Sequence, residues 1–174
     1  VIISEANSRR YTSIVIDSME DEENQRHNLA TLIARKVDGI IAAPCGSDSS
    51  LFEEIRKMQI PLVLIDRFFS DTHISYVTTN NYLGGVEGTN MLIRNGHKNI
   101  ACIQGAKSSM PNRKRVAGYM EALKHAGLQD NAILVGDEFS IQNGYMETKL
   151  LLGRKPRPTA IFSLSNTIGL GAMK

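Results

Sequence analysis

Residues 36–68 read KVDGIIAAPCGSDSSLFEEIRKMQIPLVLIDRF. This stretch contains two short apolar runs, Gly39 to Ala43 and Leu62 to Ile65, and polar residues follow each of them. Both runs are too short for a helix, and such runs are typical of buried parallel strands. Between them, Leu51, Ile55 and Met58 recur at helical spacing. The stretch therefore predicts a strand, a helix and a second, parallel strand.

The local chemistry of this stretch supports that reading. The helix is expected to open with a capping box formed by Ser50 and Glu53. Ser47 follows the first strand, and Asp66 and Arg67 follow the second. Ligands of doubly wound sheets bind beyond the carboxyl ends of the strands. A carboxylate beside a guanidinium suits a ligand with several hydroxyls, although the same two residues equally fit an internal salt bridge.

The rest of the chain alternates apolar runs with amphipathic segments. Strands are expected at residues 11–16, 76–78, 100–104, 133–135 and 160–164, and helices at residues 21–33, 81–95, 115–126 and 144–152 and from residue 169 onward. This alternation predicts an α/β protein with parallel sheets and right-handed crossovers. The loop before Asn80 is the longest interruption. We therefore expect an N-terminal lobe over residues 1–80 and a C-terminal lobe over residues 81–174.

Composition excludes several classes of protein. The 174 residues are 42% apolar and 22% charged, which is typical of a globular protein. The net charge of +2 is too small to argue for nucleic-acid binding on its own. Cys45 and Cys102 each lie in or beside an apolar run, which predicts buried thiols in a reducing compartment rather than a disulfide. No run approaches the roughly 20 apolar residues that a membrane helix needs.

No catalytic or metal-binding pattern stands out. The four histidines are isolated in sequence, without the spacing of metal ligands. The pair Glu53 and Glu54 lies early in a helix, where the helix dipole explains it. We therefore expect no catalytic residue, no metal, no cofactor and no enzymatic activity. The polar and aromatic residues that follow predicted strands describe a binding cleft better than an active site; they are Ser47, Asp66, Arg67, the loop from Gly105 to Arg115, Phe139 and Asn166.

Ordered motifs resemble a known family. The segments KVDGIIAAP, IPLVLIDR, NNYLGG, LIRNGHKNIACIQG, RKRVAGYMEALKHAGL, GYMETKLLL and PTAIFSLSNTIGLGAMK occur in this order along the chain. In order and spacing they are similar to the lactose-repressor (LacI) and purine-repressor family of transcription regulators. The resemblance implies a two-lobed, periplasmic-binding-protein-like fold, in which each lobe is a doubly wound parallel sheet flanked by helices and the lobes close on a ligand.

The resemblance also implies roles for individual residues. Arg115 matches an arginine that grips sugar hydroxyls or another polar group, and Asp66 and Arg67 match the strand end that binds ligand in ribose-type relatives. Phe139 matches an aromatic that packs on the ligand, although it fits core packing equally well. Asn166 matches a ligand-contacting asparagine.

Two departures alter the polar pattern of the second lobe. Asn80 and Thr167 stand where aspartates are usual in the family.

The function implied by the resemblance is effector sensing in a cytoplasmic, homodimeric transcription regulator. The effector would be a small polar molecule such as a sugar or sugar phosphate, and operator DNA would bind only through a separate N-terminal helix-turn-helix. The alternative is a periplasmic sugar-binding protein that serves a transporter. Because residues 1–6 look like the middle of a helix, we interpret the chain as a fragment that lacks the family's first strand and the later part of the second lobe.

Overall fold

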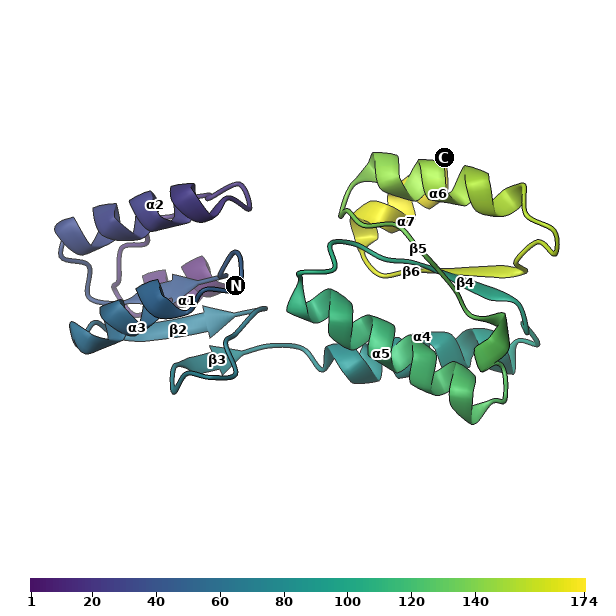
Figure 1. Cartoon of the computed structure of the whole chain (residues 1–174). Helices are drawn as coiled ribbons and strands as arrows, with labels where there is room; N and C mark the ends of the chain where they lie inside the picture. Colours follow the sequence, from purple (N-terminus) through teal and green to yellow (C-terminus); the bar gives the residue numbers. More distant parts are fainter. The chain divides into compact units, whose positions relative to one another are not determined.

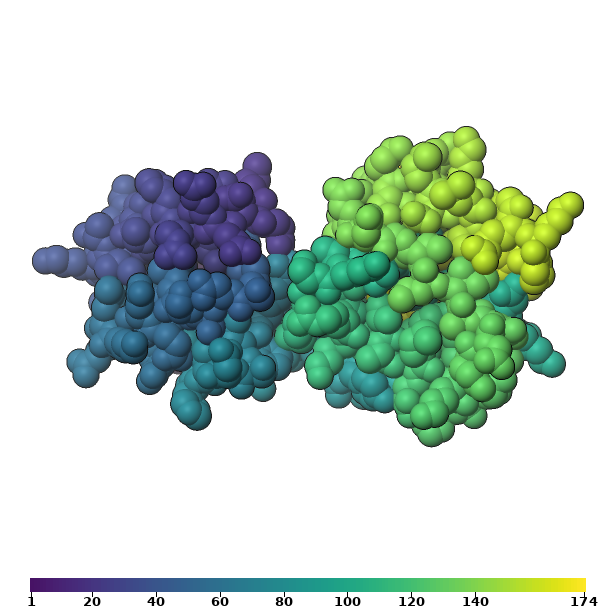
Figure 2. Space-filling model, viewed as in Figure 1, coloured from purple at the N-terminus to yellow at the C-terminus, as the bar shows by residue number.

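A computed structural model describes all 174 residues. The chain divides into two compact units, Val1–Tyr76 and Val77–Lys174, and each is described on its own. Figure 2 shows the outer surface of each unit, the first coloured purple to teal and the second teal to yellow. Both units combine helices with short strands paired in parallel, so the predicted α/β class is confirmed. None of the helices combines the length and the hydropathy needed to cross a bilayer.

The first unit holds a three-stranded sheet. Its elements are α1 (Ile2–Ser8), α2 (Glu22–Ala34), β1 (Ile40–Ala42), α3 (Ser50–Lys57), β2 (Leu62–Ile65) and β3 (Ser75–Val77). The strand order is β1-β2-β3, and β1 pairs with β2 in parallel, with Ile40 opposite Leu62 (Figure 1). Helix α3 connects these two parallel strands, so the predicted strand, helix and strand are confirmed.

Of the residues expected on the inward face of helix α3, Ile55 is buried and Leu51 is half-buried, but Met58 is exposed. Phe52 and Ile55 are fully buried in the core of the unit, where Phe52 lies 5.3 Å from the ring of Phe69. The predicted capping box is wrong by one residue, because the N-cap is Ser49 and its side chain makes no capping hydrogen bond. Asp48 stabilises the first turn instead, since its carboxylate accepts hydrogen bonds from both the amide and the hydroxyl of Ser50.

The strand predicted over residues 11–16 is wrong. This segment has no regular secondary structure and belongs to neither sheet, and the side chains of Ile14, Val15 and Ile16 are all exposed. Strand propensity alone does not form a strand, because the backbone groups need a hydrogen-bonded neighbour. These residues find no such neighbour in the chain.

The second unit is a three-layer arrangement. Its elements are α4 (Asn81–Arg94), β4 (Ile100–Ile103), α5 (Met110–His125), a 3₁₀ turn (Gln129–Asn131), β5 (Ile133–Val135), α6 (Ile141–Leu152), β6 (Ala160–Ser163) and α7 (Asn166–Ala172). The strand order is β5-β4-β6, and β4 pairs in parallel with both neighbours. Helices α4 and α5 cover one face of this sheet, and α6 and α7 cover the other (Figure 1).

The central strand β4 shows why both faces are covered. All four of its residues are fully buried, and successive side chains point to opposite faces. Ile100 and Cys102 pack with Tyr119 of α5, whereas Ala101 and Ile103 pack against α6 and α7. A strand that is apolar on both faces needs helices on both sides, as in doubly wound folds.

Helix α5 begins five residues before the predicted start at Arg115. Ser109 is the N-cap, and Pro111 lies in the first turn, where a missing backbone N–H costs nothing. Arg115 therefore belongs to the second helical turn and not to the loop. The glycine-rich helix α4 packs closely at Gly85, where a Cβ would lie 2.2 Å from the carbonyl oxygen of Arg115.

Candidate functional site

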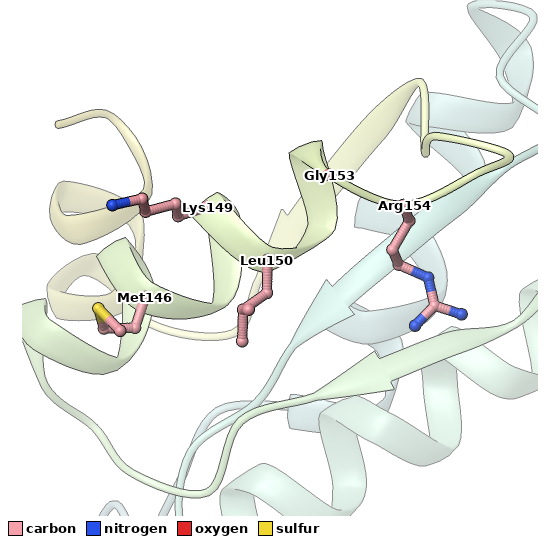
Figure 3. Close-up of a pocket in the computed structure, with 5 residues that line it drawn as sticks. All are labelled: Met146, Lys149, Leu150, Gly153 and Arg154. Carbon is pink, nitrogen blue, oxygen red and sulfur yellow. The ribbon is translucent and has the colours of Figure 1, made fainter.

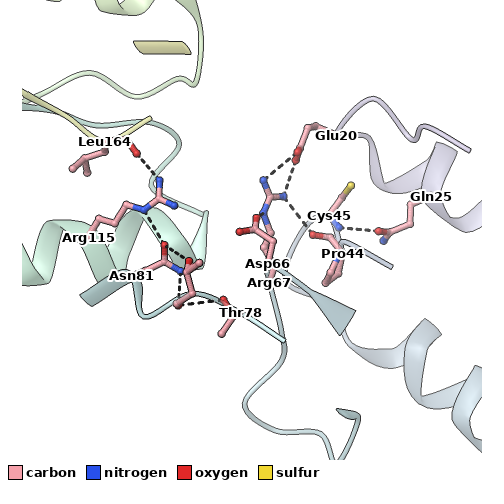
Figure 4. A network of polar contacts seen from close by, with 11 residues as sticks. Glu20, Gln25, Pro44, Cys45, Asp66, Arg67, Thr78, Asn81, Arg115 and Leu164 are labelled. Atoms are coloured by element: carbon pink, nitrogen blue, oxygen red, sulfur yellow. Dashed lines mark hydrogen bonds and ion pairs between the residues drawn. The ribbon is translucent and has the colours of Figure 1, made fainter. Parts of the chain in front are cut away.

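The candidate residues of the first unit lie where β1 and β2 end. Because the strands are parallel, their carboxyl ends share one edge of the sheet. Arg67 follows β2, and its Nη1 donates a hydrogen bond to the carbonyl oxygen of Pro44 after β1, at 3.3 Å (Figure 4). Arg67 thus connects the two strand ends.

Asp66 adopts an unusual backbone conformation at this edge. Its φ is 63°, and the amide of Arg67 donates to the carbonyl of Ile65 at 2.7 Å, which is the hydrogen-bond pattern of a γ-turn. Left-handed φ is uncommon outside glycine, and aspartate is among the residues that tolerate it best. The turn leaves the Asp66 carboxylate exposed, with Oδ2 at 3.9 Å from Nε of Arg67. The internal salt bridge considered from the sequence is therefore present but long.

The closer partner of Arg67 is Glu20, which sequence reasoning missed. Nη1 and Nη2 of Arg67 donate to the two oxygens of the Glu20 carboxylate, at 2.6 and 3.1 Å. The two residues are 47 positions apart, so no local sequence pattern connects them. The only sequence signal was an acidic residue that precedes the helix N-cap Asp21.

The loop after β1 is held by helix α2. The side-chain oxygen of the buried Gln25 accepts the amide of Cys45 at 2.8 Å. At Gly46, φ is 71°, which favours glycine, and a Cβ there would lie 2.1 Å from the carboxylate of Glu22 and displace it. Ser47 follows this turn and is exposed. The structure therefore brings Ser47, Asp66 and Arg67 to one edge of the sheet.

Both cysteines are buried thiols, as predicted. Burial raises the pKa of Cys45, and the negative charge of Glu20 raises this pKa further, while Arg67 lowers it. Burial also raises the pKa of Cys102. Because the thiolate is the reactive form, neither cysteine is activated as a nucleophile.

In the second unit, the Arg115 side chain forms hydrogen bonds within the protein. Its Nε donates to Oδ1 of Asn81 at 2.8 Å, and its Nη1 donates to the carbonyl oxygen of Leu164 (Figure 4). The guanidinium thus connects the start of α4 to the end of β6. These bonds use two of its five N–H groups, so the others can serve a ligand.

Phe139 and Asn166 lie beyond the ends of β5 and β6. The Phe139 ring packs against the core that α6 and α7 cover, and a Cβ on Gly105 would lie 2.2 Å from it. Phe139 is half-buried, and it packs against this core while covering the backbone at the end of β4. Asn166 is exposed in the first turn of α7, directly after the N-cap Ser165. Leu164, which binds Arg115, lies two residues before Asn166.

A pair of buried amides supports this edge, and sequence reasoning missed it. Asn112 is 1% exposed and Gln104 is 5% exposed. Asn112 donates to Oε1 of Gln104 at 3.1 Å, and its own Oδ1 accepts the amide of Gly105 at 2.9 Å. These bonds fix the loop between β4 and α5. A polar residue directly after a strand, with another in the first turn of the next helix, was the available signal.

An open surface hollow lies elsewhere. It is an open depression over α6, lined by Met146, Lys149, Leu150, Gly153 and Arg154 (Figure 3). It contains none of the six candidate residues, and its exposed position on the outside of a helix gives no convergent set of polar groups. The strand ends, and not this hollow, carry the candidate chemistry.

Comparisons with known proteins agree with this arrangement. All of residues 1–174 match the family described as periplasmic binding proteins and sugar binding domain of the LacI family. The chain is 32% identical over 165 residues to the transcriptional repressor PurR of Actinobacillus pleuropneumoniae, covering 94% of this chain and 49% of that protein. It is 33% identical over 167 residues to the ribose operon repressor of Escherichia coli, covering 94% of this chain and 50% of that protein.

A solved structure extends the similarity to the fold. A putative ribose operon repressor from Burkholderia thailandensis superposes with a TM-score of 0.84 at 29% identity, covering 99% of this chain and 64% of that one. The chain spans about half the length of the curated relatives it matches. The match over its whole length shows that it belongs to the family of periplasmic binding proteins and sugar-binding domains of LacI-type regulators.

Proposed function

We propose that the chain is the effector-sensing part of a LacI-type transcription regulator that acts in the cytoplasm. Its effector is a small polar molecule of the sugar or sugar-phosphate class. The regulator works as a homodimer and binds operator DNA through a separate helix-turn-helix. Support comes from the relatives, which are named as repressors, including PurR and a ribose operon repressor.

The observation that carries the proposal is the polar edge of the first sheet. There a guanidinium and a carboxylate lie side by side, and Arg67 also contacts the carbonyl of Pro44 at the neighbouring strand end. Such a pair can donate to and accept from adjacent hydroxyls. In the second unit the proposed effector residues are Arg115, Phe139 and Asn166, and in the first unit they are Ser47, Asp66 and Arg67.

The proposed mechanism is a shift between conformational populations. A ligand changes the equilibrium only by its difference in affinity for the two conformations. Residues that contact both the ligand and the fold suit this role, since a change in their ligand contacts alters their protein contacts too. Arg115 is such a residue, because it connects α4 with the end of β6.

A thermal-shift screen of the full-length protein tests the proposal. The panel contains neutral sugars, sugar phosphates and nucleobases. A ligand present at 100 times its Kd stabilises the bound fold by about 2.7 kcal/mol. Stabilisation by a member of the panel, lost in an Asp66→Asn variant and kept in an Asp71→Asn variant, supports the proposal. Failure of every compound to stabilise the protein contradicts it.

A second candidate is a periplasmic sugar-binding protein of a transporter, because the family description covers both classes. The sequence encoded upstream of Val1 separates the two. A helix-turn-helix supports the regulator, and a secretory signal peptide supports the transporter protein.

A further inference from the structure

One carboxylate already occupies the guanidinium of Arg67. Glu20 binds it with both oxygens, at 2.6 and 3.1 Å, in the two-pronged geometry that carboxylates and phosphates share. The Arg67 side chain is only 22% exposed, whereas that of Glu20 is 72% exposed. On the solvent side, both terminal nitrogens of Arg67 are therefore already bonded to Glu20 when a phosphate or carboxylate approaches.

The backbone holds Glu20 in this position. Met19 and Glu20 have φ of 55° and 57°, and the amide of Asp21 donates to the carbonyl of Ser18 at 3.0 Å. Two left-handed residues at the centre of a turn define type I′, which glycine and asparagine usually supply. The Asp17 carboxylate accepts the Met19 amide at 2.9 Å, which braces the turn. Glu20 is thus presented by a defined turn and not by a loose loop.

The charges around Arg67 are mostly negative. Asp66 Oδ2 lies 3.9 Å from its Nε, so two carboxylates share one guanidinium. Close by, at Cys45, Glu20, Asp21 and Glu22 all raise the pKa of the thiol, and Arg67 is the only group that lowers it. This edge therefore repels an anion but offers carboxylate oxygens that accept hydrogen bonds from hydroxyls.

We infer that Glu20 is a specificity-determining residue, which makes this edge of the first unit select neutral hydroxyl groups and reject phosphate or carboxylate groups. The inference rests on the proposed effector-binding function and narrows its ligand class. An exposed ion pair adds little to stability, so the selectivity comes chiefly from the negative charges of Glu20 and Asp66, which disfavour a further anion beside Arg67. An anion has to displace Glu20 and leave its carboxylate unpaired beside Asp66, whereas hydroxyls can bind to the carboxylates and leave the pair intact.

The first test needs no knowledge of the effector. Arg67 is modified with phenylglyoxal in the intact chain, with and without inorganic phosphate at constant ionic strength, and the product is followed by peptide mass analysis. In the natural protein, phosphate leaves the rate of Arg67 modification unchanged. In Glu20→Gln, Arg67 reacts several-fold faster and phosphate slows this reaction. Glu23→Gln removes an exposed charge from α2, the helix that follows this turn, and behaves like the natural protein.

A second variant protects this test against misfolding of the turn. Glu20→Gly removes the carboxylate and suits the positive φ, so it reproduces the result of Glu20→Gln. Protection by phosphate in the natural protein overturns the inference. Unchanged reactivity of Arg67 in both Glu20 variants overturns it as well.

The second test compares D-ribose with D-ribose 5-phosphate by calorimetry. The natural protein binds the neutral sugar more tightly, and Glu20→Gln reduces this preference about tenfold, as expected for removing one nearby charge in a partly shielded site. Preference of the natural protein for the phosphate overturns the inference. If neither sugar binds while the phenylglyoxal results hold, the proposed ligand class fails and the role of Glu20 in excluding anions stands.

Discussion

Replacing Arg115 by alanine separates a ligand contact from a structural one. The sequence alone suggests that Arg115→Ala loses ligand affinity with little loss of stability. The structure predicts a loss of stability as well, because the guanidinium binds the side chain of Asn81 and the carbonyl of Leu164. Leu164 is 3% exposed and Asn81 is 6% exposed, so water cannot readily replace the lost donor.

The size of the effect follows from these partners. Leaving a buried carbonyl without its partner costs about 1–3 kcal/mol. The Oδ1 of Asn81 keeps a longer contact with the Thr79 hydroxyl, at 3.4 Å, so its loss adds less. We expect the free energy of unfolding of the second unit to fall by about 2 kcal/mol. For a domain near 100 residues, this lowers Tm by about 8–16 °C.

The assay is urea unfolding followed by circular dichroism, with calorimetry for Tm. Lys114→Ala is the matched control, because Lys114 is exposed on the same helix and alanine, arginine and lysine have similar helix propensities. Arg115→Lys keeps a charged donor and recovers part of the loss. If Arg115→Ala and Lys114→Ala differ by less than about 0.5 kcal/mol, the two hydrogen bonds contribute nothing and the structural reasoning is refuted.

Three further predictions concern single positions. Gly85→Ala lowers the free energy of unfolding in urea by about 1–3 kcal/mol, because the added Cβ meets the Arg115 backbone. Gly84→Ala, whose Cβ would meet nothing within 4 Å, is neutral or stabilising. Asp66→Gly retains or gains stability, since φ is 63°, but loses ligand affinity in calorimetry. Burial raises the pKa of Tyr119 from 10.0 to about 12, so the unfolded chain ionises first and stability falls as pH rises from about 10 to 12; Tyr119→Phe, followed by unfolding at each pH, weakens this fall.

The fold was largely predictable because its signals are local. The strand at Leu62–Ile65 and the helix that precedes it follow from periodicity within a few residues. The segment 11–16 shows the limit of such signals, since a strand depends on a neighbour that its own residues do not specify. The start of α5 was misplaced because Pro111 indicates a loop as readily as a first helical turn.

The sequence was sufficient to predict which residues lie at the edge of the sheet, but not which residues they contact. Parallel strands place their ends together, so Ser47, Asp66 and Arg67 were expected to lie close. The contact between Arg67 and Glu20 depends on a turn of two left-handed residues without glycine, which residue preferences disfavour. The position of Glu20 beside Arg67 therefore could not be predicted from the sequence.

Arg67 and Arg115 share a property that bears on effector binding. Each was expected to contact ligand, and each already donates to its own unit, to Glu20 and Pro44 in one case and to Asn81 and Leu164 in the other. An arginine side chain carries about 2 kcal/mol of rotamer entropy. Because folding has already restricted these rotamers, the ligand does not bear that cost when it binds. The same contacts limit which ligands fit, since Arg67 offers its outer fork only to a group that can displace a carboxylate.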